Sequence, residues 1–262
     1  MTRFLPLALF LLLLAGCSSG PHIDKRYVSA NHDSREQFIV LHYTSTGFEQ
    51  SVKLLTHGEV SAHYLIDRDP ARIYQLVDEN RRAWHAGEST WNGRTWLNSS
   101  SIGIEMINPG YRLNEDGQRV WYPYADAQID ELIVLLKDIM QRHGLGPDAV
   151  VGHSDIAPQR KVDPGPLFPW KRLADAGLIR WPDAASVERA QAVYANGLPD
   201  ATWFQGELAK FGYDVPRTGL FDEQTRNVIA AFQMRYRQQR YDGQADAETA
   251  ALLWVLNNSR RS

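Results

Sequence analysis

The sequence predicts an α/β fold, in which a mixed β-sheet flanked by helices is followed by a small bundle of three helices. Up to about residue 182, short apolar runs rich in β-branched residues alternate with amphipathic segments. Beyond that point the apolar residues recur at helical spacing only. We therefore expect an α/β domain over residues 36–182 and a smaller helical domain over residues 183–262.

The expected strands are short, and they cover residues 37–43, 62–66, 72–77, 101–107 and 149–152. The first of them, from Gln37 to Tyr43, is continuously hydrophobic, which is typical of a strand buried on both faces. His42 falls at its carboxyl end, where α/β sheets place their ligands.

Helical patterns separate and follow these strands. A short helix is expected over 48–55, and a longer one over 125–143, where Ile129, Leu132 and Leu136 recur at helical spacing and Gly144 ends the helix. Further helical patterns cover 187–196, 202–211, 222–237 and 246–257. Their short connections indicate the three-helix bundle.

The N-terminus predicts export. Residues 1–16 combine one basic residue, Arg3, with an apolar run too short to cross a bilayer comfortably, as in a secretory signal. The run ends in Leu14-Ala15-Gly16-Cys17, which resembles the bacterial lipobox, and Cys17 is the only cysteine. A buried free thiol is the alternative. We expect Cys17 to carry the acyl chains, palmitate among them, of a lipoprotein.

Ser18 after the cysteine favours sorting to the outer membrane, with the protein facing the periplasm. Residues 17–35 would form a tether that is small and polar at its start. The formal net charge is −3 and becomes −4 when the signal is removed. A mildly acidic chain without a clustered basic face is not built to bind nucleic acid. The sequence indicates no oligomeric state.

The loop from Gly152 to Pro166 carries the most informative chemistry. It places His153 and Asp163 ten residues apart, with Lys161 two residues before the aspartate, among three prolines that restrict the backbone. Together with His42, these residues offer two imidazoles and one carboxylate, a donor set that zinc accepts while keeping one position open for water. Taken alone, a histidine such as His42 at a strand end is more often an ordinary core histidine than a ligand, and only the combination of the three residues indicates a metal site.

Five motifs in order resemble the zinc-dependent N-acetylmuramoyl-L-alanine amidases, within the amidase and peptidoglycan-recognition-protein superfamily. They lie at residues 41–44, 60–66, 83–87, 101–105 and 153–165. The resemblance spans about residues 36 to 168. With the lipobox and the C-terminal region, the chain looks most like the lipoprotein amidases anchored in the outer membrane of Gram-negative bacteria.

The resemblance implies hydrolysis of the amide between N-acetylmuramic acid and L-alanine in peptidoglycan or muropeptides. It implies that His42, His153 and Asp163 hold Zn²⁺, that Glu105 is the general base, and that Lys161 stabilises the developing oxyanion. Glu105 lies in an apolar strand, where an unpaired carboxylate is costly. The alternatives are an outward-facing strand glutamate and an ordinary loop lysine.

Other residues near these motifs allow more than one role. His63 and His85 either line the substrate pocket, or orient a metal ligand, or serve a structural purpose. Asp155 is expected to accept backbone N–H groups within its loop. Trp91 and Trp96 either stack on sugar rings or cover the core, and the core interpretation is favoured.

The C-terminal region resembles three-helix peptidoglycan-binding domains. The likeness lies in residues 208–214, 221–233 and 243–249. The usual Gly-Leu-x-x-Asp-Gly run is only partly present, because Gly219-Leu220-Phe221-Asp222 continues with Glu223. A module that packs against its neighbour is therefore an alternative to one that binds the cell wall.

Three other functions compete with the amidase hypothesis. A recognition protein of the same fold would bind muropeptide without cutting it, but such proteins typically lack the third ligand, which Asp163 supplies here. A lipoprotein that only tethers the wall would not need the zinc loop. A peptidase acting within the stem peptide would use the same metal chemistry.

Overall fold

The computed structural model describes residues 21 and 23–259 of the 262-residue chain. The described residues up to His32 and those from Asp33 onward belong to two separate units. Of the first unit, the described residues 21 and 23–32 contain no helix or strand. The expected signal and the lipidation site Cys17 lie outside the described residues. Within the described part of the chain, no helix has the length and apolar character needed to cross a membrane.

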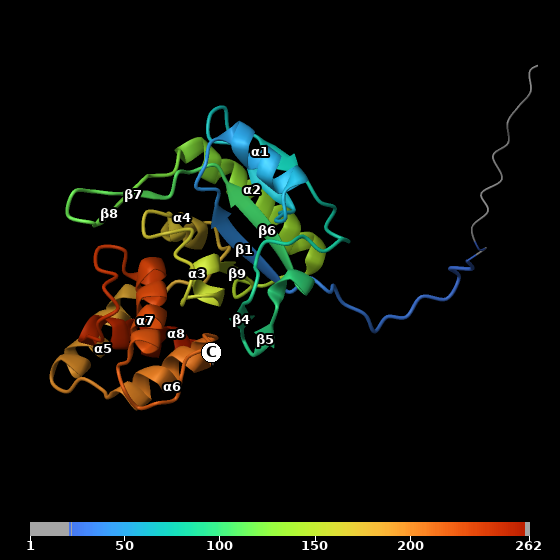
Figure 1. Ribbon diagram of the computed structural model, residues 1–262. Coiled ribbons are helices and arrows are strands. Elements are labelled where there is room, and N and C mark those ends of the chain that lie inside the picture. Colours follow the sequence, from blue (N-terminus) through green and yellow to red (C-terminus); the bar gives the residue numbers. More distant parts are fainter. Residues whose placement is uncertain (1–20, 22, 260–262) are drawn as a thin grey trace, which may run out of the picture. The chain divides into compact units, whose positions relative to one another are not determined.

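A five-stranded mixed sheet forms the centre of the second unit (Figure 1). Its strands run in the order β3 (Ile73–Gln75), β2 (Tyr64–Ile66), β6 (Ser101–Met106), β1 (Phe38–Tyr43) and β9 (Val150–Gly152). All neighbouring strands are parallel except β3, which pairs antiparallel with β2 at one edge. The expected mixed sheet is confirmed, and each strand lies within a range predicted from the sequence.

The alternation of side chains along β1 and β6 separates a structural face of the sheet from a functional one. Ile39 and Leu41 face α2 (Asp126–His143) and α4 (Trp170–Asp175) in one apolar cluster. Phe38 and Val40 belong to a different cluster. His42 is two residues after Val40 on the same strand, so its side chain points to the same face as those of Phe38 and Val40. That face is opposite α2. The parallel register pairs His42 with Glu105 on β6.

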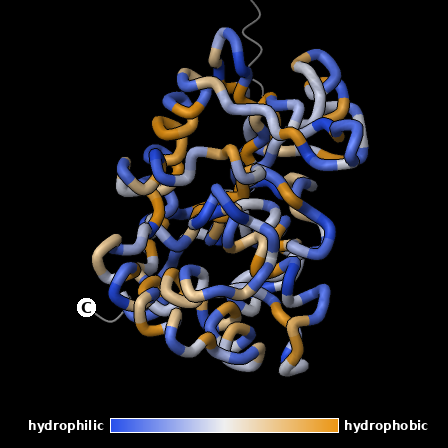
Figure 2. Tube along the Cα trace, turned by 90° about the vertical axis from the view of Figure 1, so that its left-hand side faces the viewer, coloured by the Kyte–Doolittle hydropathy of each residue, from blue (hydrophilic) through white to orange (hydrophobic). Residues whose placement is uncertain are grey.

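The long helix α2 has the features that its sequence predicts. Its buried apolar residues form one stripe, and it ends at Gly144, whose φ of 66° is the left-handed conformation that glycine adopts readily. α1 (Phe48–His57) lies beside the sheet and contributes Leu55 to a smaller apolar cluster. Figure 2 shows hydrophobic and hydrophilic residues interspersed along the chain, with several hydrophilic loops at the edges of the view.

Two hairpins and a short helix were not expected from the sequence. β4 (Thr90–Trp91) pairs with β5 (Arg94–Thr95), and η1 (Leu97–Ser99) follows them. β7 (Tyr111–Leu113) pairs with β8 (Arg119–Trp121) in a second hairpin. The strands in both hairpins are too short for a detectable alternation of apolar and polar residues.

The C-terminal module contains α5 (Ala184–Ala195), α6 (Ala201–Phe211), α7 (Glu223–Tyr236) and α8 (Ala247–Asn258). Each begins after an aspartate whose carboxylate accepts a backbone N–H of the first turn; these are Asp183, Asp200, Asp222 and Asp246. The three helices α6 to α8 match the expected bundle. α5 adds a fourth helix, which packs on α8 through Ala190, Ala251 and Val255.

This module shares an apolar cluster with the sheet. Phe38, Val40 and Val151 of the sheet belong to the same cluster as Phe204 and Phe232 of the module. Trp91 of β4 contacts Phe211 and Tyr213 edge to face, with ring centroids 6.1 and 4.9 Å apart. The module therefore packs against the α/β part rather than extending from it as a separate arm.

The segment after β9 differs from the sequence expectation. It was expected to be a loop, but its first residues form the short helix α3 (His153–Ile156). The carboxylate of Asp155 accepts the N–H of Gly152 at 2.8 Å and so closes the first turn, which confirms the expected bond to backbone. The rest of the segment, from Ala157 to Pro169, contains neither helix nor strand.

Candidate metal centre and active site

Three side chains from distant parts of the chain meet at the carboxyl end of the sheet. His42 lies at the end of β1, His153 begins α3, and Asp163 lies in the segment that follows. The two Nδ1 atoms are 2.9 Å apart, and Asp163 Oδ2 lies 3.2 Å from Nδ1 of His42 and 3.1 Å from Nδ1 of His153. All three residues are buried. The structure thus brings together the three residues that the sequence predicts as metal ligands.

The hydrogen bonds of His153 fix which ring nitrogen faces this centre. Its Nε2 lies 3.1 Å from the carbonyl oxygen of Ala86, which can only accept, so Nε2 carries the proton. In the neutral ring Nδ1 then presents a lone pair toward Asp163. Asn98 holds the backbone at this point, because its Oδ1 accepts the N–H groups of His85 and Ala86.

A chain of hydrogen bonds fixes His42 in the same way. The hydroxyl of Ser101 donates to the carbonyl of Leu97 at 2.6 Å, so it accepts from His85 Nε2 at 3.3 Å. His85 Nδ1 therefore accepts from His42 Nε2, 3.0 Å away, which leaves a lone pair on Nδ1 of His42. Burial lowers the pKa of His42 to about 4 and holds that of His85 well below its usual range. Both rings are neutral at pH 7.

The glycine at position 103 makes room for this chain. A Cβ there would lie 2.3 Å from the ring of His85, closer than carbon atoms approach. Any other residue on β6 at this point would displace His85 and remove the acceptor that orients His42.

The three facing atoms fit a metal ion. Each can present a lone pair here, because the other ring nitrogen of each histidine bonds elsewhere and an ionised carboxylate oxygen can only accept. Three lone pairs about 3 Å apart repel one another unless a cation lies between them. Bonds of about 2.0–2.1 Å in a tetrahedral shell separate ligand atoms by about 3.3 Å, close to the distances observed.

Glu105 lies beside this centre on the neighbouring strand. Its side chain lines the same cavity as the three candidate ligands, and among the described residues its buried Oε2 has no hydrogen-bond partner. Burial, and after it the nearby Asp163, raise the pKa of Glu105 while Lys161 opposes them, and together they bring it to about 8. A buried carboxylate without a partner is costly, so this atom is suited to bind a proton or water.

The cavity around these groups has a volume of about 370 Å³. Lys161 and Tyr111 line it together with the candidate ligands, and its apolar wall includes Val60 and the half-exposed Trp84. The guanidinium of Arg82 lies 4.0 Å from the ring centroid of Trp84, within the range of a cation–π contact. The cavity therefore combines charged groups with an apolar wall beside them.

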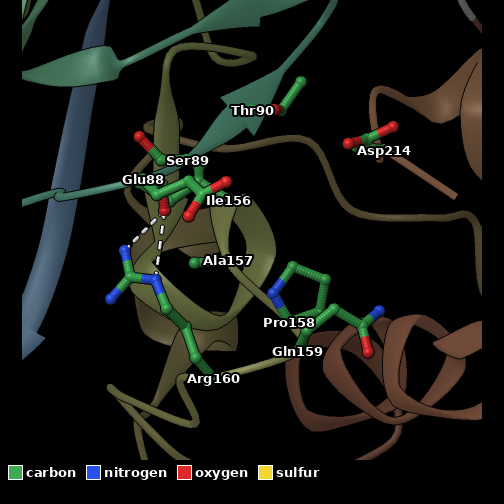
Figure 3. A pocket seen from close by; sticks show the side chains of 9 residues that line it. All are labelled: Glu88, Ser89, Thr90, Ile156, Ala157, Pro158, Gln159, Arg160 and Asp214. Carbon is green, nitrogen blue, oxygen red and sulfur yellow. Dashed lines mark hydrogen bonds between the residues drawn. The ribbon is translucent and has the colours of Figure 1, made fainter.

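A second cavity, of about 250 Å³, lies at the carboxyl end of α3 (Figure 3). Ile156, Ala157 and Pro158 line it along with Asp214 of the C-terminal module. Arg160 borders it and donates to the carbonyl oxygen of Glu88 from Nε and Nη2, at 3.1 and 2.6 Å. None of the described lining residues is a candidate ligand or Glu105, so the reaction is assigned to the first cavity.

The structure separates the two uncertain histidines. His63 accepts the N–H of Gly103 at 2.9 Å and bonds the carbonyl of Arg81 at 3.0 Å, so its role is to join backbone segments. His85 orients a candidate ligand, as described above. Trp91 is buried against the C-terminal module, whereas Trp96 is 62% exposed to solvent. The expectation that these tryptophans cover the core is therefore met by Trp91 and not by Trp96.

Comparison with known proteins agrees with this geometry. Residues 32–166 match the family described as N-acetylmuramoyl-L-alanine amidase. Over an alignment 271 positions long, the chain is 44% identical to the N-acetylmuramoyl-L-alanine amidase AmiD of Escherichia coli K12, and the match covers 98% of each protein. The chain belongs to this amidase family.

Solved structures extend the similarity to both parts of the amidase. The Escherichia coli AmiD complex with anhydro-N-acetylmuramic acid-L-Ala-D-γ-Glu-L-Lys superimposes with a TM-score of 0.82, at 42% identity, over 92% of this chain and 95% of that one. AmpDh3 of Pseudomonas aeruginosa in complex with an anhydromuramic pentapeptide gives 0.85, at 42% identity, over 92% and 99%. Residues 198–253 match a family described as a putative peptidoglycan-binding domain.

The sequence did not reveal several groups around the amidase site. Trp84 and Tyr111 line the cavity, and the only signal for Trp84 in the sequence is its place next to His85 in the motif at residues 83–87. Two residues of the C-terminal module, Tyr213 and Arg235, bond the side chain of Asp155 beside His153. No pattern near Asp155 indicates these partners, because both lie far along the chain.

Proposed function

We propose that this chain is a zinc-dependent amidase that hydrolyses the bond between N-acetylmuramic acid and L-alanine in peptidoglycan or in soluble muropeptides. The observation that carries the proposal is the convergence of two imidazole nitrogens and a carboxylate oxygen next to the carboxylate oxygen of Glu105 that has no partner among the described residues. A recognition protein that binds without cutting would need neither arrangement.

Zinc is proposed from the chemistry of the donors. Two imidazole nitrogens and one carboxylate oxygen form a set that suits zinc, and three protein ligands leave a fourth position open, as in catalytic zinc sites. His42, His153 and Asp163 would hold the zinc ion, and its Lewis acidity would acidify a water molecule and polarise the carbonyl of the substrate.

The residues of the chain itself supply the remaining steps. Glu105, as the general base, removes a proton from the attacking water and passes it to the departing amine of L-alanine. Lys161 lines the same cavity, so its ammonium group stabilises negative charge as it develops on the carbonyl oxygen. The ring of Trp84 provides an apolar surface against which a sugar ring or a methyl group of the substrate can pack.

The first prediction concerns the products. The purified protein, incubated with muropeptide and zinc, is expected to release a peptide that begins with a free L-alanine amino group, together with a sugar that has lost its peptide. Mass analysis identifies both fragments, and a chelator should stop their formation. Cleavage inside the stem peptide would instead show a peptidase, and intact muropeptide would show a recognition protein.

We also propose that the protein is anchored through Cys17 to the outer membrane and faces the periplasm, where its substrate lies. The support is the sequence Leu14-Ala15-Gly16-Cys17 followed by Ser18. Several acyl chains on one residue give a stable anchor, whereas one chain binds only marginally.

Replacing Cys17 by serine tests the anchor. The unchanged protein is expected in the outer-membrane fraction and should incorporate radioactive palmitate, whereas Cys17→Ser should lose the label and should not be recovered with the outer membrane. Equal labelling of both proteins, or recovery of the unchanged protein in the inner membrane, would contradict the proposal.

A further inference from the structure

The side chain of Asp155 joins the helix of a candidate metal ligand to the C-terminal module. It lies in α3, two residues after His153, and is 1% exposed. Its Oδ2 accepts the N–H of Gly152 at 2.8 Å and the guanidinium of Arg235 at 3.0 Å, while Oδ1 accepts the hydroxyl of Tyr213 at 2.6 Å. Two of these three donors belong to the module.

The contact is a buried ion pair in which both carboxylate oxygens of Asp155 accept hydrogen bonds. Arg235 of α7 is 4% exposed, and its guanidinium lies 4.4 Å from the ring centroid of Trp170 in the α/β part. Burial, reinforced by Asp155, holds the pKa of Tyr213 well above its usual range, so its hydroxyl stays protonated and donates. A pair of this kind is weak as a source of stability but specific in geometry. It fixes where Asp155 lies.

The position of Asp155 sets the position of both candidate ligands in this segment. α3 contains four residues, too few to be stable without outside contacts. The N–H of Ser154 donates to the carbonyl of Asp163 at 2.8 Å, so the position of the Asp163 backbone depends on the position of α3. A displacement of Asp155 would therefore move His153 and Asp163 away from His42.

We propose that the C-terminal module braces the metal centre, with Asp155, Arg235 and Tyr213 as positioning residues for His153. The module then has a task within the catalytic site, separate from any binding of the cell wall. This inference rests on the metal site of the proposed function, because its readout is metal binding.

The module offers matched controls for the test. Arg237 lies two residues after Arg235, is equally buried, and forms its ion pairs with Asp242, Asp246 and Glu248 inside the module. Arg237→Met therefore disturbs the module without touching Asp155. Tyr241→Phe is the control for Tyr213→Phe, since the hydroxyl of Tyr241 accepts from Trp121 Nε1 at 2.8 Å, away from α3.

The experiment measures zinc affinity by competition with a chelator in the full-length protein, together with the visible spectrum of the Co²⁺-loaded form and the unfolding temperature. Loss of a group that orients a ligand typically weakens metal binding by about 10- to 100-fold. We expect zinc affinity to fall by about 10- to 100-fold in Arg235→Met and by about 10-fold in Tyr213→Phe. The visible spectrum of the Co²⁺-loaded form should change in both variants. Tyr213→Phe removes only a hydroxyl group, so it decides the matter if Arg235→Met does not fold.

The controls Arg237→Met and Tyr241→Phe should bind zinc within about twofold of the unchanged protein, whatever their unfolding temperatures. A double variant of Asp155→Asn with Arg235→Met should lose less affinity than the two single losses combined, because both residues act through one contact. Equal losses in Arg235→Met and Arg237→Met would overturn the brace and leave the metal site intact. Failure of the unchanged protein to bind zinc would overturn the proposed function itself.

Discussion

Replacing His153 by alanine is expected to abolish metal binding and amide hydrolysis together. The change leaves His42 and Asp163 as the only protein ligands among the three that converge here. A catalytic zinc with two protein ligands is held weakly. The Lewis acidity of the metal contributes several kcal/mol to the rate, so activity should fall by about 1,000-fold or more.

Metal analysis of the purified variant, with the product assay on the same sample, checks this result. Treatment of the unchanged protein with a chelator should reproduce the loss, and added zinc should restore the unchanged protein but not the variant. His57→Ala is the matched control, because His57 is an exposed histidine at the end of α1. Full metal content in His153→Ala would remove His153 from the proposed ligand set.

Replacing Glu105 by glutamine is expected to separate metal binding from catalysis. Glutamine has nearly the same shape but cannot accept a proton from water, so zinc content should be unchanged while the rate falls by about 100- to 10,000-fold. Glu188→Gln, an exposed position on α5, serves as the control for the loss of one negative charge. Metal loss as complete as in His153→Ala would place Glu105 among the ligands instead.

The pH dependence of the rate gives a second readout for Glu105. Burial raises the pKa of Glu105, and the base works only in its ionised form, so kcat/KM should rise as increasing pH removes the proton. The positive charge of a bound metal lowers this pKa, so the rise should lie below the value of about 8 that holds for the protein alone. The residual activity of Glu105→Gln should lack this acid limb.

The sequence by itself determined the sheet, the long helix and the residues of the candidate centre. Continuous apolar runs define β1 and β6 because both lie at the centre of the sheet. Side chains alternate between the two faces of a strand, so His42 and Glu105 point to the same face when β1 pairs with β6 in the observed register. Five motifs in order carried the resemblance to the amidase family, which the similarity to AmiD confirmed.

Only the tertiary structure decided what surrounds these residues. The helical form of α3, the separate roles of His63 and His85, and the position of Trp91 all depend on neighbours elsewhere in the chain. Asp155 illustrates the reason, since Tyr213 and Arg235 lie 58 and 80 residues away from it. Periodicity reports the environment of a segment along its own length, whereas a buried hydrogen bond between distant segments leaves no local pattern.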